Sequence, residues 1–109
     1  MSVRDMVKDI QTEMRETDLM PTRASQLLAK ATALMGNCMA EIREADFEYA
    51  QVLLKILETE KVVAKAKIRA EVTPEYLRRQ EARDTHKLVD EMSKSLKYVQ
   101  RAAEAEMRL

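Results

Sequence analysis

The sequence has little of what most enzymes and small cross-linked domains need. Its 109 residues include one Gly, one Cys, one His and no Trp. A single Gly excludes a Gly-rich phosphate-binding loop, and one Cys with one His excludes a disulfide framework, a Cys-x-x-Cys redox pair and a zinc knot. Aromatic residues are 4% of the chain, so aliphatic side chains and methionine must supply the core. We expect a protein that is not an enzyme and that holds no metal or cofactor.

Long hydrophobic runs are absent as well. No apolar run approaches the roughly 18 residues that a membrane-spanning helix needs. The first ten residues mix acids with apolar side chains, unlike a secretory signal. The single cysteine, Cys38, agrees with a reducing compartment. We therefore expect a soluble, cytoplasmic protein with no membrane partner.

Two prolines divide the chain into three expected helices. Pro21 interrupts the first apolar repeat, and Thr22 is expected to cap a helix that begins at the next residue. Further on, Thr73, Pro74 and Glu75 have the order of an N-cap, a first-turn proline and a first-turn acid. The sequence predicts helices over residues 2–16, 23–71 and 74–108, within one all-helical domain that spans 1–109. The alternative is that Pro74 kinks one continuous helix, although the residue before a proline disfavours helix.

The long middle helix has a strict heptad repeat. Large and small apolar residues alternate along one seam, which is typical of close antiparallel helix packing. The two core positions are occupied by Leu28, Met35, Ile42, Tyr49, Ile56, Val63 and Ala70, and by Ala31, Cys38, Ala45, Val52, Thr59 and Ala66. The pattern predicts an all-α fold, an elongated antiparallel helical hairpin or coiled coil with a short N-terminal helix.

Helix lengths predict how the three helices pair. At 1.5 Å per residue the middle helix is ~74 Å long, the third ~53 Å and the first ~22 Å, so the two outer helices are expected to lie end to end along it. Residues of the second and third helices then pair where their numbers add to about 145. On this register Leu88 meets Leu57 and Leu96 meets Tyr49. Gly36 marks the place where the free ends of the two outer helices approach each other.

A second apolar flank runs beside the seam of the middle helix. It consists of Leu27, Leu34, Met39, Leu53 and Leu57. We interpret this flank as a partner surface. The expected occupant is a second copy of the chain, so that a homodimer or higher oligomer completes a four-helix section, and the other occupant is an unidentified protein.

The net charge of zero hides a gradient along the chain. Residues 1–60 have a net charge of minus 4 and residues 61–87 a net charge of plus 4. The basic residues of the second segment form a candidate anion-binding tip: Lys61, Lys65, Lys67, Arg69, Arg78, Arg79, Arg83 and Lys87. Clustered cations suit nucleic-acid phosphates. The competing interpretation is a solvated hairpin in which Lys67 pairs with Glu71 and Glu75 with Arg79.

Two further groups of residues have the composition of possible chemical sites. Glu41, Glu44 and Glu48 form a carboxylate stripe, but the chain has no Glu-x-x-His, so the ligands of a di-metal helical bundle are missing. Cys38 falls at a core position of the heptad repeat, where it is expected to be a small buried hydrophobe. Neither group predicts catalysis.

Part of the sequence resembles a group of phage proteins. The segment from Ala45 to Met92 combines a long helix, the run from Ala64 to Glu71, a short turn and a further helix. In pattern and composition it is similar to small helical-hairpin proteins of bacteriophage and prophage genomes, whose functions are mostly unknown. The resemblance implies a phage origin, a bacterial host cytoplasm and, for some such proteins, partners in replication or recombination.

These observations give two hypotheses for function. The first is a non-enzymatic, phage-related interaction or adaptor protein that acts through the apolar flank of its middle helix. The alternative is a nucleic-acid-binding accessory factor of phage replication or recombination that uses the basic tip.

Overall fold

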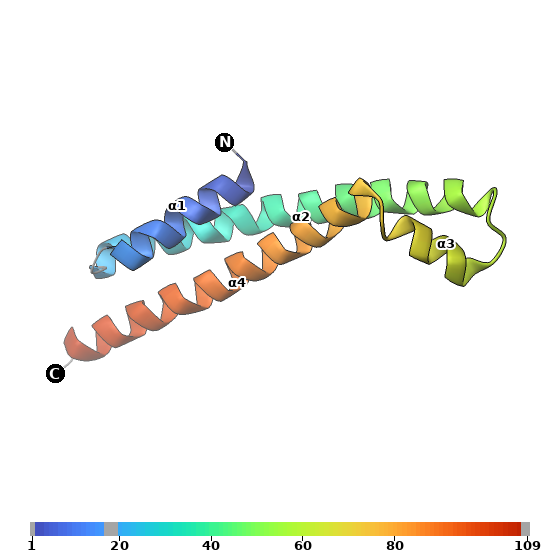
Figure 1. Ribbon diagram of the computed structural model, residues 1–109. Helices are drawn as coiled ribbons and strands as arrows, with labels where there is room; N and C mark the ends of the chain where they lie inside the picture. The colour runs from blue at the N-terminus through green and yellow to red at the C-terminus, as the bar shows by residue number, and fades with distance from the viewer. Residues whose placement is uncertain (1, 17–19, 108–109) are drawn as a thin grey trace. The chain divides into compact units, whose positions relative to one another are not determined.

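The computed structural model describes residues 2–16 and 20–107, and these residues form four helices. They are α1 (Val3–Glu16), α2 (Pro21–Leu57), α3 (Val63–Ala70) and α4 (Pro74–Met107) (Figure 1). The predicted all-α class is confirmed. The helices form two compact units, unit 1 with Met1–Asn37 and Thr85–Leu109, and unit 2 with Cys38–Asp84. Residue 108, which ended the predicted third helix, lies outside the described residues.

The helix starts follow local capping chemistry. Before α1, the Ser2 hydroxyl accepts a hydrogen bond from the Asp5 backbone N–H, and the Asp5 carboxylate accepts one from the Ser2 N–H. This reciprocal pair is a capping box that sequence analysis overlooked. The start of α2 was also predicted wrongly, because the helix begins at Pro21 and not at residue 23. Proline suits the first helical position, since its missing N–H needs no partner there.

The predicted helix over residues 23–71 is wrong, because it is broken between Leu57 and Val63. The Thr59 hydroxyl donates to the Ile56 carbonyl, and the Glu60 carboxylate accepts from the Val62 N–H. Such local bonds offer the backbone an alternative to the helical ladder. The β-branched Thr59, Val62 and Val63 also favour helix less than the alanine-rich segments on either side.

The predicted start of the last helix is confirmed. α4 begins at Pro74 with Glu75 in its first turn, and the Thr73 hydroxyl accepts a weak hydrogen bond of 3.4 Å from the Tyr76 N–H. The same hydroxyl donates to the Ala70 carbonyl at 2.6 Å. Thr73 therefore closes α3 and caps α4.

Unit 1 has a core of large apolar side chains from three helix segments. Along α1, Val3, Val7 and Ile10 recur at helical spacing and are buried. The N-terminal part of α2 and the C-terminal part of α4 complete this core with Ala24, Leu27, Ala31, Leu34, Val89, Met92 and Leu96. Figure 1 shows α1 beside the first part of α2, where Arg23 Nη2 contacts Glu13 Oε1 at 2.7 Å.

The predicted pairing of the outer helices is wrong within each unit. In unit 2, Tyr49 contacts Tyr76, whereas the predicted register assigned Leu96 to Tyr49. In unit 1, Gln100 Nε2 donates to Ser25 Oγ at 2.6 Å. In both contacts the residue numbers add to about 125 instead of about 145, because residues 58–73 form a turn and α3 in place of a longer α2.

The altered register also changes the arrangement of unit 1. Both α1 and the C-terminal part of α4 contact the start of α2, so the two outer helices are not end to end there. The interpretation of Gly36 is wrong for the same reason. Gly36 is exposed, and a Cβ atom built at this position meets nothing within 4 Å.

Unit 2, every residue of which is described, buries only small side chains. Its buried residues are Cys38, Ala45, Ala66, Ala70 and Ala82. Ala66 and Ala70 are one turn apart on α3, so this short helix packs through a face of methyl groups. The seam residues Tyr49, Val52 and Ile56 of α2 are half-buried. The heptad repeat thus predicted the packed side of α2 but not how completely each unit covers it.

Candidate interaction surface

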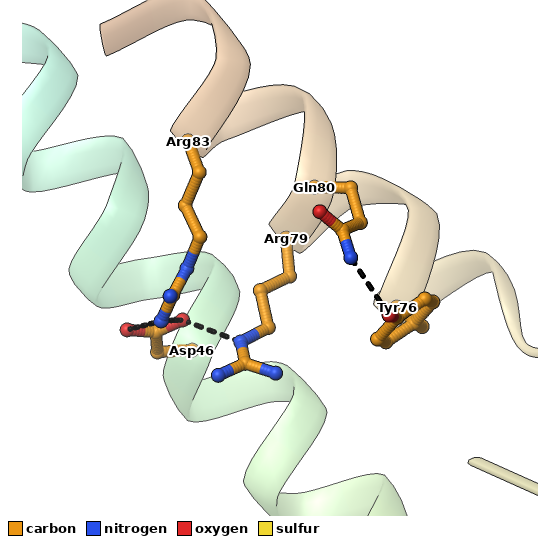
Figure 2. A network of polar contacts seen from close by, with 5 residues as sticks. All are labelled: Asp46, Tyr76, Arg79, Gln80 and Arg83. Carbon is orange, nitrogen blue, oxygen red and sulfur yellow. Dashed lines mark hydrogen bonds and ion pairs between the residues drawn. The ribbon is translucent and has the colours of Figure 1, made fainter. Parts of the chain in front are cut away.

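A polar network joins α2 and α4 in unit 2, and its centre is Asp46 (Figure 2). Arg79 Nε donates to Asp46 Oδ1 at 3.0 Å, and Arg83 Nη2 donates to the same oxygen at 3.1 Å. Partial burial acts to raise the pKa of Asp46, but the hydrogen bonds and charges of Arg83 and Arg79 outweigh it and hold the pKa below its usual value. Asp46 is therefore the anionic anchor for two cations of α4.

Aromatic contacts lie beside this network. The rings of Tyr49 and Tyr76 have their centroids 5.6 Å apart, and the Arg79 guanidinium carbon lies 4.8 Å from the centroid of the Tyr49 ring. Gln80 Nε2 donates to the Tyr76 hydroxyl at 2.7 Å (Figure 2). A separate ion pair joins the same two helices, with Arg78 Nη1 2.7 Å from Glu48 Oε2. Charge and ring contacts together fix the α2–α4 register in unit 2.

Three residues of the predicted anion-binding tip are already paired. Arg78, Arg79 and Arg83 bind carboxylates of α2 and do not form a free cationic surface. The competing prediction of local pairs is also wrong, because Arg79 contacts Asp46 and not Glu75. Lys67 and Glu71 form no ion pair in the described part of the chain either.

The remaining tip residues divide into two groups. Lys61, Lys65, Lys67 and Arg69 lie on and just before α3, are exposed, and have no hydrogen bond or ion pair with any described residue. Lys87 belongs to unit 1, while the other seven tip residues belong to unit 2. Only the four cations around α3 thus form a free basic segment.

The predicted partner flank is partly inside the protein. Leu27 and Leu34 are 1% and 5% exposed, because in unit 1 both α1 and α4 pack beside α2, so these two residues are core and not a partner surface. Leu53 and Leu57 are half-buried in unit 2. Met39 alone of the five is exposed, at 42%.

Large apolar side chains are nevertheless exposed, and they concentrate in unit 2. Among the described residues, eight of the ten exposed large hydrophobic side chains belong to this unit, which is less than half of the chain. We call these eight the exposed apolar set of unit 2: Met39, Phe47, Leu54, Val62, Val63, Ile68, Val72 and Leu77. Exposed apolar residues gathered in one region commonly mark an interaction site.

Two members of this set, Phe47 and Leu54, belong to a regular line of residues on α2. Ala40, Phe47 and Leu54 follow one another at intervals of seven, and Arg43, Ala50 and Leu57 fall between and after them at steps of three and four. We call these six residues the α2 stripe. At 3.6 residues per turn the stripe lies on the side of α2 opposite Cys38 and Ala45, which are buried. Phe47 and Leu54 are 64% and 66% exposed.

Sequence analysis missed the α2 stripe because it considered only the heptad seam and the apolar flank directly beside that seam. The stripe has the same 3,4 spacing half a turn away, and it combines the small Ala40 and Ala50 with larger residues. A search for a second repeat on the opposite face of the helix would have found it.

The carboxylate stripe and Cys38, the two other groups considered in the sequence, have defined surroundings in the structure. No cluster of three or more metal-ligating side chains occurs in the described ranges, and Glu48 of the predicted carboxylate stripe is paired with Arg78. Cys38 is fully buried, as predicted, and burial together with the charge of Glu41 raises the pKa of its thiol. A thiol with a raised pKa is a poor nucleophile.

A groove of 430 Å³ lies between α1 and α2 in unit 1. Apolar residues such as Ile10 and Leu34 line it, together with one acid, Asp9, and one amine, Lys30.

A search of the described helices for a membrane-spanning segment, which must be both long and apolar, finds none.

Comparison with known proteins does not assign the chain to a family. No protein family, curated protein or solved structure matches it.

Proposed function

We propose that this protein is a non-enzymatic interaction protein in which unit 2 is the docking region. The observation that carries the proposal is the contrast between what unit 2 buries and what it exposes. It buries Cys38 and four alanines, while Phe47, Leu54 and Ile68 are each more than 60% exposed. The similarity to phage helical-hairpin proteins supports a phage-related adaptor acting in a bacterial cytoplasm.

The energetics of exposed apolar surface support this proposal. Burial of a Leu, Ile or Phe side chain contributes about 1.5–3 kcal/mol, so a partner that covers several members of the exposed apolar set has a substantial driving force. Helical partners are favoured, because the α2 stripe offers the 3,4 spacing into which a second helix packs. The four free cations around α3 add a preference for an acidic partner.

The test is quantitative capture by the full chain from a lysate of the cells in which it naturally occurs. Wild type is compared with Phe47→Ser and Ile68→Ser, and the matched control is Tyr98→Ser, because Tyr98 is 75% exposed in unit 1. We expect a set of proteins that wild type and Tyr98→Ser both capture and that the unit 2 variants lose. Capture of the same set by all four proteins would contradict the proposal, provided that circular dichroism shows each variant to be folded.

A second candidate function is nucleic-acid binding by the free basic segment. It is favoured by the exposure of Lys61, Lys65, Lys67 and Arg69 and by their lack of a described partner. Neutralising about four phosphates would give a salt slope of about −3.6, so binding should weaken roughly a hundredfold between 50 and 200 mM salt. Fluorescence anisotropy with labelled oligonucleotides measures this slope.

The matched pair of variants for the nucleic-acid test is Lys67→Glu and Lys97→Glu. Both lysines are exposed, but Lys97 lies on α4 in unit 1. Selective loss of binding with Lys67→Glu would support the basic segment as a phosphate site. Absence of binding at low salt, or equal loss in both variants, would contradict it.

A further inference from the structure

We propose that the α2 stripe is a dimer interface, and that its occupant is the same stripe of a second copy of this chain, lying antiparallel. The inference rests on the proposed function, since it names the partner for one part of the docking region. A twofold interface places the same patch on both subunits, so the patch must be complementary to itself when it is turned around. The α2 stripe meets this requirement in both shape and charge.

The shape of the stripe is self-complementary. In an antiparallel pair of helices with residue numbers that add to about 97, each large residue faces a smaller one or an aliphatic stem. Phe47 lies against Ala50 of the second copy, and Leu57 lies against Ala40. Leu54 packs along the side-chain stem of Arg43. Each of these pairings occurs twice, because the axis passes between residues 48 and 49.

The charge of the stripe is self-complementary as well. Its N-terminal end carries Arg43, and Glu58 directly follows its C-terminal end. Both side chains are exposed, and neither has a hydrogen bond or an ion pair with any described residue. In the antiparallel arrangement Glu58 of the second copy lies about one turn beyond the residue that faces Arg43. At the rim, Glu44 falls beside the second copy's Lys55. Two pairs of each kind form around the axis.

Other arrangements of the stripe lose this complementarity. In a parallel, in-register dimer Arg43 would face Arg43 and Phe47 would face Phe47, while Ala50 would face Ala50 and leave a gap. The packed face of α2 is not available, since Cys38 and Ala45 on that side are 0% and 4% exposed. The antiparallel pair is therefore the arrangement that the stripe fits.

The first test is sedimentation equilibrium of the purified full chain between about 5 and 200 µM. An interface of one helix face per subunit is small, so we expect a reversible dimer with a dissociation constant in the micromolar range. A mass of 12.6 kDa throughout this range would overturn the inference. If such a monomer still captures proteins through unit 2 in the lysate experiment, the proposed function stands and only the self-association is wrong.

A matched pair of variants locates the interface. Leu54 lies on the stripe and is 66% exposed, while Leu77 lies on α4 and is 59% exposed. We expect Leu54→Lys to weaken the dimer more than tenfold, because it removes an apolar contact and places a second cation beside Arg43 of the other copy, and Leu77→Lys to leave it unchanged. Equal weakening in both variants would overturn the inference. Because both leucines are exposed, we expect the monomers to stay folded, and circular dichroism checks this.

A charge exchange tests the orientation. Arg43→Glu and Glu58→Arg each place like charges together in an antiparallel homodimer, so we expect each alone to dimerise several-fold more weakly than wild type. Mixed in equal amounts, the two variants restore both ion pairs, and the heterodimer should regain wild-type affinity. A parallel dimer predicts a different result: Arg43→Glu mixed with wild type would gain affinity, and Glu58→Arg would have no effect. That result would overturn the antiparallel arrangement.

Discussion

Units 1 and 2 use the same helices, α2 and α4, but differ in what they bury. In unit 1 the residues Leu27, Leu96 and Val7 are at most 1% exposed, because three helix segments enclose them. Unit 2 buries Cys38 and alanines, while Phe47 and Leu54 face solvent. One half of each long helix therefore belongs to a conventional hydrophobic core, and the other half presents a surface.

This difference means that apolar burial stabilises unit 1 more than it stabilises unit 2. A buried leucine contributes about 1.5–3 kcal/mol from the loss of apolar surface, and an alanine contributes much less. Unit 2 compensates with directional contacts, in which Asp46 binds Arg79 and Arg83 and the Tyr49 and Tyr76 rings meet. A region stabilised in this way can keep its large apolar side chains available for a partner.

The largest change in stability is expected from a substitution in the core of unit 1. Leu27→Ala removes a side chain that is 1% exposed and leaves a cavity, so the free energy of unfolding should fall by about 2–5 kcal/mol. The matched variant Leu54→Ala acts on a leucine of the same helix that is 66% exposed, and it should change stability by less than about 0.5 kcal/mol. Urea unfolding followed by circular dichroism measures both. Equal losses would show that the two units do not differ as described.

The next effect concerns the small-residue packing of α3. Ala66→Leu places a larger side chain where the exposed fraction is zero, so α3 should be displaced at a cost of about 1–3 kcal/mol. Ala64→Leu is the control, because Ala64 is exposed two residues away. Amide hydrogen exchange should show lost protection in α3 with the first variant and none with the second. Unchanged protection with Ala66→Leu would contradict the close packing of this helix.

The polar network of unit 2 should make a smaller, pH-dependent contribution to the free energy of unfolding. Because Asp46 is 40% exposed and screened by solvent, Asp46→Asn should cost about 0.5–1 kcal/mol at pH 7. The pKa of Asp46 is lowered on folding, so its contribution is present above its ordinary value of 3.8 and disappears as pH falls through the folded-state pKa.

Unfolding curves at several pH values test this sign. The difference between wild type and Asp46→Asn should be full near neutral pH and should shrink below about pH 4. Asp84→Asn is the control, since Asp84 is exposed and forms no ion pair with a described residue. A difference that grows as the pH is lowered would contradict the assigned role of Asp46.

The smallest expected effect is a gain in stability. Gly36 lies inside α2, and a Cβ atom at that position meets nothing within 4 Å. Gly36→Ala should therefore raise the free energy of unfolding by about 0.5–1 kcal/mol, because alanine loses less conformational entropy in a helix. Thermal unfolding detects the change. A loss of stability would mean that another chain approaches closely at Gly36.

Much of the local structure could be predicted from sequence. Pro74 with Thr73 before it marked the start of α4 correctly, since capping and proline geometry act within a few residues. The break after Leu57 was missed, because it depends on a hydrogen bond that the Thr59 hydroxyl donates and on one that the Glu60 carboxylate accepts, in a segment without glycine or proline. The pairing error of about 20 residues followed directly from that missed break.

The candidate site was predicted less well than the helices. Leu27 and Leu34 look like partner-binding residues in the sequence, because periodicity shows that a helix face is apolar and not which helix covers it. Likewise, composition placed Arg79 and Arg83 in a basic tip, but their bonds to Asp46 span more than 30 positions in the chain. Contacts over such a separation leave no local signal.

The sequence by itself determined that this chain is helical and where α4 starts, since apolar spacing, capping residues and proline act over a few neighbouring residues. Only the tertiary structure decided which apolar face becomes core and which stays exposed. That outcome depends on how many helices pack beside α2 in each unit. Two helices enclose Leu27 in unit 1, whereas the face of Phe47 in unit 2 stays exposed.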